Sequence, residues 1–226
     1  MSEHRRSADF GRRPYRLKAR AASQDETRRR ITEATVELHE EQGPLATTVS
    51  AIAERAGVQR LTVYRHFPDE EALFAACTGH YIGQHPFPDP RSWAEVADPV
   101  VRLRRGLGEL YAYWGSVEAM FAKVLRDQEV DPERTRGAPL VEYMEGARDA
   151  LVAGWGIRGR RAQRLRGVVG HAVDFRTWHS LVRRHGLGDD EVVGLMVALA
   201  EAAAELTATP PRGRSPRSGG GGGGAR

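Results

Sequence analysis

The chain has 226 residues, one cysteine and a formal net charge of +4. A single cysteine excludes an internal disulfide and any zinc site built from several cysteines, which suits a reducing compartment. No stretch of about eighteen apolar residues is present and the arginine-rich N-terminus lacks an apolar core, so we expect neither a membrane span nor a signal peptide.

The positive charge is concentrated at the two ends of the chain. Residues 1–24 carry +5 and residues 207–226 carry +4, which leaves −5 for residues 25–206. Neither end has a hydrophobic period, and the second contains six consecutive glycines. We therefore predict a disordered basic arm over 1–24, which either follows DNA phosphates or only improves solubility, and a flexible tail over 207–226.

A first helix is predicted over 25–42, where Ile31, Ala34 and Leu38 recur at helical spacing before Gly43 and Pro44. Two short helical patterns then follow within residues 47–67. The first has Thr47 or Thr48 at its N-cap and Gly57 after its end. The inward positions of the pair are Val49, Ile52, Ala53, Ala56, Val58, Val63 and Phe67. This arrangement is typical of a helix-turn-helix, whose second helix enters a major groove.

The outer face of the second short helix is polar, basic and aromatic. Hydroxyl groups and a helix N-terminus can bind phosphates, Arg60 can bind guanine with two hydrogen bonds, and Leu61 can pack on a thymine methyl group. The alternative is an ordinary capped and solvated surface. We predict DNA contacts from Thr47, Thr48, Gln59, Arg60, Leu61, Thr62, Tyr64, Arg65 and His66.

A longer motif runs through this segment. It comprises Thr48-Val49, Ile52-Ala53, Ala56-Gly57-Val58 and Thr62-Val63-Tyr64-x-His66-Phe67, followed by Pro68-Asp69-Glu70-Glu71-x-Leu73. In this motif the chain resembles the TetR-type transcriptional regulators, over about sixty residues from 25 to 85. The resemblance implies a dimer with an effector pocket. Glu70 stands where the family commonly has a lysine, so we expect no phosphate contact from that position.

A fourth helix is predicted over 69–84, and the proline-rich segment 85–90 separates a head (25–85) from a body (93–206). In the body we predict helices over 99–115, 117–127, 139–153, 159–185 and 189–206. The last two have broad apolar faces, which favour a self-associating interface. We predict that this dimer interface contains Val168, Ala172, Trp178, Val192, Met196, Leu199 and Ala203.

Aromatic residues of the body either line an apolar effector pocket or fill a core. As pocket residues we predict Tyr111, Trp114, Phe121, Tyr143, Met144, Trp155, His171 and Phe175. No glycine-rich phosphate loop, nucleophile elbow or His-Glu-x-x-His motif occurs, and His171 with Asp174 lacks the second pair that a metal site in a helical bundle needs. We therefore predict no enzymatic activity, no cofactor and no bound metal.

Together these patterns predict an all-α protein with a three-helix, homeodomain-like helix-turn-helix head and a C-terminal helical bundle for ligand binding and dimerisation. We interpret the chain as a cytoplasmic transcriptional repressor that joins the nucleoid when bound to DNA. It would bind a palindromic duplex operator as a homodimer and respond to a small, largely apolar effector, without membrane contact. The alternatives are a dimeric DNA-binding regulator with no ligand and a helical-bundle enzyme with a DNA-binding head.

Overall fold

The computed structural model describes residues 12–131 and 138–206, and no strand occurs within these ranges. The all-α prediction is confirmed. The elements in chain order are α1 (Arg12–Gln42), α2 (Val49–Arg55), α3 (Arg60–His66), α4 (Glu70–Gln84), α5 (Pro90–Ala94), α6 (Pro99–Val130), α7 (Ala138–Val152), α8 (Gly159–Val173), α9 (Phe175–His179), the π-helix η1 (Ser180–Arg184) and α10 (Asp189–Glu205). None of the described helices combines the length and apolar character needed to cross a membrane.

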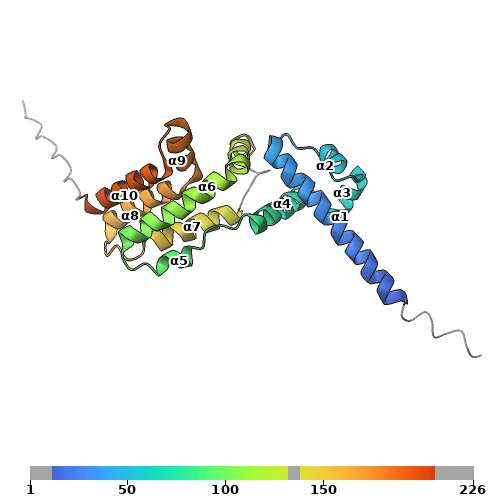
Figure 1. The fold of residues 1–226 in the computed structure, drawn as a ribbon, viewed down its shortest axis with the longest axis horizontal. Coiled ribbons are helices and arrows are strands. Elements are labelled where there is room, and N and C mark those ends of the chain that lie inside the picture. Colours follow the sequence, from blue (N-terminus) through green and yellow to red (C-terminus); the bar gives the residue numbers. More distant parts are fainter. Residues whose placement is uncertain (1–11, 132–137, 207–226) are drawn as a thin grey trace, which may run out of the picture.

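Helices α1 to α4 form a head at one end of an elongated molecule, and α5 to α10 form a bundle at the other end (Figure 1). The head has its own apolar core, as the stripes in the sequence predict. This core contains Ile31, Ala34, Leu38, Ile52, Ala53, Ala56, Val63, Phe67 and Leu73, with Val49 and Val58 packed against it. Because this core joins α1 to both short helices, it fixes α3 against the rest of the head.

Helix α1 begins well before its predicted start, at Arg12 instead of residue 25. The prediction of a disordered arm is therefore wrong for residues 12–24. Arginine, lysine, alanine and leucine dominate this segment and are good helix formers, while Pro14 lies in the first turn, where its missing N–H is not needed. The rest of the predicted arm (1–11) and the predicted tail (207–226) lie outside the described residues.

Two helix boundaries in the body also differ from prediction. Helix α6 is continuous from Pro99 to Val130, through Gly115 and Ser116, where two helices were predicted. The Ser116 hydroxyl donates to the Tyr113 carbonyl at 2.7 Å, so its polar group is satisfied within the helix. The predicted helix over 159–185 is divided at Asp174. Its Oδ1 accepts a hydrogen bond of 2.7 Å from the Arg176 backbone N–H and so caps α9, a role that aspartate prefers to a helix interior.

Helix α10 packs on α8 and α6 within the same chain. This packing, together with that of α9 on α6 and α8, buries five of the residues predicted at the dimer interface to 5% exposure or less: Ala172, Trp178, Val192, Met196 and Ala203. They cannot offer a surface to a second copy, so the prediction is wrong for them. The sequence shows how broad an apolar face is, whereas a third helix covering that face is seen only in the fold. Of the remaining two, Leu199 is 43% exposed and Val168 is partly buried.

Candidate nucleic-acid interface

The turn between α2 and α3 depends on a glycine. Gly57 has a φ of +65°, and the Val58 N–H donates to the Ala53 carbonyl at 2.9 Å, which closes the end of α2. A Cβ atom at Gly57 would also lie only 2.9 Å from an Arg30 guanidinium nitrogen, and this guanidinium donates to the Ala56 carbonyl. The backbone conformation therefore favours glycine at this turn, as predicted, and a side chain there would also displace the Arg30 guanidinium.

Helix α3 is anchored on its inner side and at its C-terminal end. Val63 and Phe67 are each 1% exposed. Arg28 of α1 donates from Nη1 to the His66 carbonyl at 2.7 Å, and its guanidinium lies 4.2 Å from the centre of the Phe67 ring. A cation at a helix C-terminus is favourable. The role of Arg28 was not predicted, because Arg28 lies 38 residues from His66 in the sequence.

Most of the predicted DNA-contacting residues lie on α3, and Gln59 lies at its N-cap. Leu61 is 68% exposed and Tyr64 is 46% exposed. Gln59, Arg60 and Arg65 are also exposed, whereas Thr62 and His66 are partly buried. No carboxylate occurs between Gly57 and Phe67. The outer face of α3 therefore combines positive charge with an exposed phenol and an exposed aliphatic group, as a surface facing DNA requires.

The two threonines before α2 have different roles. Thr48 is the exposed N-cap of α2, and its hydroxyl oxygen accepts a hydrogen bond of 3.2 Å from the Ala51 N–H. Thr47 is 5% exposed, and its hydroxyl donates to the Gly43 carbonyl at 2.8 Å. The prediction of a DNA contact is therefore wrong for Thr47, because this side chain stabilises the loop from inside.

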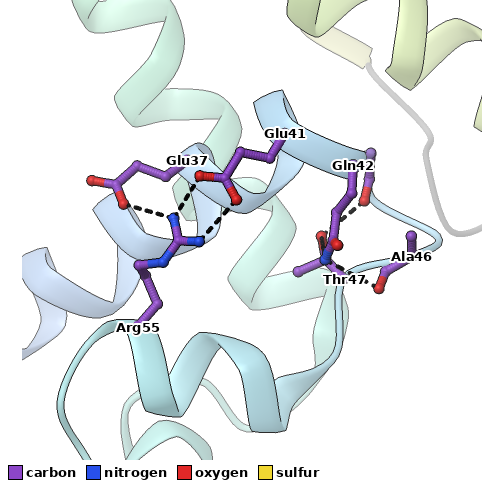
Figure 2. A network of polar contacts seen from close by, with 7 residues as sticks. Glu37, Glu41, Gln42, Ala46, Thr47 and Arg55 are labelled. Carbon is purple, nitrogen blue, oxygen red and sulfur yellow. Dashed lines mark hydrogen bonds and ion pairs between the residues drawn. The ribbon is translucent and has the colours of Figure 1, made fainter.

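An ion-pair network holds α2 against α1 (Figure 2). Arg55 of α2 contacts the carboxylate of Glu37 at 3.1 Å and that of Glu41 at 2.8 Å. The hydrogen bond from Arg55 keeps the pKa of Glu41 below its usual value. Such exposed pairs add little stability, but two acceptors on one helix face restrict the angle between α1 and α2.

Helix α1 also presents basic residues beyond the helix-turn-helix. It projects past α2 and α3 (Figure 1), and Lys18 and Arg20 are exposed on this part. The positive charge that the sequence places in the arm is therefore carried in part by a helix, which can hold its side chains at fixed spacing along a phosphate backbone.

A small apolar cavity of about 80 Å³ lies where the head meets the body. Its walls come from α1, α4 and α6, with one residue from α7 and one from the α4–α5 connection. They are His39, Phe74, Cys77, Thr78, Tyr81, Ile82, Phe87, Met120, Phe121, Val124, Leu125 and Leu140. The Cys77 thiol lies 3.4 Å from His39 Nδ1, and burial raises its pKa to about 12. The cavity therefore contains a neutral thiol and mostly hydrocarbon surface.

Of the eight predicted pocket residues, only Phe121 lines this cavity. Tyr111, Trp114 and Phe175 are core residues: the Tyr111 hydroxyl donates to the Ala172 carbonyl at 2.8 Å, the Trp114 indole donates to the Val173 carbonyl at 3.2 Å, and Phe175 packs on Trp114. The prediction of a shared pocket is wrong for these three, because aromatic residues at helical spacing fill the interior of the bundle.

The other four predicted pocket residues are dispersed. Tyr143 stacks on Phe87 with ring centres 4.2 Å apart, and Met144 lines an open groove of about 270 Å³ between α6, α7 and α8. Trp155 donates to the Leu151 carbonyl at 3.1 Å near the end of α7. His171 is exposed beside the Thr177 hydroxyl, 3.2 Å from its Nδ1. These positions do not form one site with Phe121.

Within the part of the chain that the structure describes, there is no group of three or more histidine, cysteine, aspartate or glutamate side chains that could bind a metal ion. The pair His171 and Asp174 has separate local roles, since Asp174 caps α9 and His171 lies beside Thr177.

Comparisons with known proteins agree with this geometry. The family model described as "Bacterial regulatory proteins, tetR family" matches residues 31–77, which include the helix-turn-helix. The HTH-type transcriptional repressor KstR of Mycobacterium tuberculosis is 33% identical over 88 residues, which are 39% of this chain and 40% of that protein. The match therefore spans about two fifths of the length of this relative.

Two solved structures share the fold. A putative fatty acid metabolism regulator from Clostridium perfringens aligns with a TM-score of 0.55 at 18% identity, over 79% of this chain and 100% of that one. A TetR transcription regulator from Haloarcula marismortui aligns with a TM-score of 0.50 at 19% identity, over 80% of this chain and 96% of that one. Residues 31–77 therefore match the N-terminal domain of the tetR family of bacterial regulatory proteins, and the described helices share the fold of two solved regulators.

Proposed function

We propose that this protein is a cytoplasmic transcriptional repressor that binds a palindromic operator as a homodimer. The observation that carries the proposal is the outer face of α3, which is exposed, basic and free of carboxylates on a firmly anchored helix. The name of KstR, a transcriptional repressor that is 33% identical to this chain over 88 residues, supports repression.

Different residues of α3 would make different kinds of contact with DNA. Tyr64 suits a phosphate, because its hydroxyl can donate to an oxygen without reading sequence. Arg60, at the start of α3, suits a guanine in the major groove, where two parallel hydrogen bonds distinguish it from the other bases. Leu61 suits a thymine methyl group, which would account for a leucine that is 68% exposed.

The outer face of α10 suits a second copy of the chain. Leu195 is 47% exposed and Leu199 is 43% exposed. Ala198 and Ala202 are exposed on the same helix and are small enough to let another helix approach closely. A two-fold contact along this face would place two α3 helices on one side of a duplex, as an inverted repeat requires.

A small apolar effector would occupy the cavity between the head and the body. Its volume of about 80 Å³ is well below the roughly 300 Å³ at which ligand pockets usually begin, so binding requires α4 and α6 to separate. An effector that favours the separated arrangement would change the position of the heads and hence the affinity for the operator. The small volume of the cavity also favours a second candidate function, a dimeric DNA-binding regulator that has no ligand and whose body serves only dimerisation.

The proposal is tested by selecting bound sequences from random duplex DNA with the purified protein. We expect enrichment of an inverted repeat with half-sites a helical turn or more apart. A variant with Arg60→Ala and Tyr64→Phe should lose most of the enrichment, and a surface variant such as Glu145→Ala should keep it. If no sequence is enriched by a folded protein, the proposed function is wrong. A thermal-shift screen of apolar compounds then separates the candidates with and without a ligand.

A further inference from the structure

The last turns of α6 contact the head through two polar residues. Asp127 is 3% exposed, and its Oδ2 accepts a hydrogen bond of 2.9 Å from the backbone N–H of Leu45. Arg126 donates from Nη2 to the Gln42 carbonyl at 3.3 Å and to Asp127 Oδ1 at 2.7 Å. Both contacts reach the end of α1 and the segment that leads from it into the helix-turn-helix.

This connecting segment is stiff. Gly43 has a φ of +92°, and a Cβ atom there would lie 2.6 Å from Asp127 Oδ2, so the carboxylate occupies the space of a side chain. The Thr47 hydroxyl donates to the Gly43 carbonyl at 2.8 Å, and the Thr47 N–H donates to the Pro44 carbonyl at 3.2 Å. Gln42 closes the loop with a bond of 3.3 Å to the Ala46 carbonyl (Figure 2). A shift of Asp127 is therefore transmitted to the start of α2.

Side-chain contacts join the helices of the head to one another. Arg55 holds α2 on α1, and Arg28 holds the end of α3 on the same helix. Next to the polar contact lies the cavity of about 80 Å³, so apolar packing between α4 and α6 is incomplete there. Val36, Cys77 and Tyr81 of the head pack into the core of the body. Because close packing fixes angles and a void does not, the hydrogen bond from Leu45 to Asp127 acts beside these apolar contacts to orient the head.

We propose that Asp127 is a positioning residue that sets the orientation of the head and thereby the half-site spacing that the dimer accepts. Hydrogen bonds to a buried carboxylate weaken steeply with distance and angle, so this contact selects one orientation. In a two-fold dimer, a tilt of each head changes the separation of the two α3 helices, which must match successive turns of the duplex. The inference rests on the proposed function, because it requires a dimer on an inverted repeat.

The experiment measures affinity for the selected operator with its half-sites moved apart or together by one and two base pairs, and for a single half-site. The variants are Asp127→Ala, which removes the acceptor, and Leu45→Pro, which removes the donor without altering α6. Leu45 is the second residue of the turn closed by Pro44 and Thr47, a position where proline is favoured. Asp127→Asn retains an acceptor oxygen, and Glu129→Ala changes an exposed side chain two residues further on.

We expect wild type to prefer one spacing, and both Asp127→Ala and Leu45→Pro to reduce that preference about tenfold, as loss of a hydrogen bond to a charged group predicts. Their affinity for a single half-site should be unchanged. Asp127→Asn and Glu129→Ala should keep the wild-type preference. If Asp127→Ala does not fold, the inference is tested by the other two variants: Leu45→Pro should lose the spacing preference and Asp127→Asn should keep it.

Two results would overturn the inference. One is a wild-type spacing preference in folded Asp127→Ala and Leu45→Pro proteins. The other is a uniform loss of affinity for all duplexes, the half-site included, in proportion to lower thermal stability, which would make the contact only structural. Failure of the wild type to enrich an inverted repeat would instead refute the proposed function itself.

Discussion

Replacement of Leu199 by arginine should separate the dimer without unfolding the chain. Leu199 is 43% exposed on α10, whereas Met196, three residues earlier on that helix, is 5% exposed. Complete burial of a leucine side chain contributes about 1.5–3 kcal/mol. Burying the exposed part of Leu199 in two copies therefore contributes about 1–3 kcal/mol, and its loss raises the dimer dissociation constant about ten- to hundredfold. Two arginines near a two-fold axis would add repulsion.

Sedimentation velocity at micromolar concentration measures this effect, with circular dichroism as the check on folding. Val101→Arg is a matched control, because Val101 is a 55% exposed aliphatic residue on α6, and it should leave the dimer intact. Met196→Ala should instead lower the free energy of unfolding by about 2–5 kcal/mol through a core cavity. If Leu199→Arg sediments like wild type, the outer face of α10 is not the interface. A wild type that is monomeric yet binds its operator tightly would refute the dimer.

Three further results are expected. Tyr64→Phe should weaken binding to all duplexes by a similar factor, whereas Arg60→Ala should relax preference at one base position at a cost of about 1–3 kcal/mol; gel-shift titrations that show neither effect would remove α3 as the reader. Ile52→Ala, at a position 3% exposed, should destabilise the head by about 2–5 kcal/mol in chemical denaturation while the bundle keeps its helical signal, and wild-type melting would contradict that. Because the pKa of Cys77 is raised from 9.0 to about 12, its contribution to stability should be complete below about pH 9 and be lost as pH rises toward 12; Cys77→Ala should flatten this part of the profile, and an unchanged profile would contradict it.

Short-range patterns in the sequence predicted the two short helices of the head correctly. The spacing of its apolar residues identified α2 and α3, Gly57 marked the turn between them, and the outward residues of α3 are exposed apart from the partly buried Thr62 and His66. These features depend on residues within one or two helical turns of each other. Helical periodicity, capping and the conformational freedom of glycine are local properties, so they can be inferred from the sequence by itself.

Only the tertiary structure decided which surfaces remain free and which helices hold each other. Whether Thr47 or Thr48 faces solvent depends on the fold of the loop, and burial of Met196 depends on α6 and α8 covering α10. The bond from Leu45 to Asp127 joins residues 82 positions apart. Periodicity identifies an apolar stripe or a polar side chain but not its neighbour, because that neighbour is selected by packing of the whole chain.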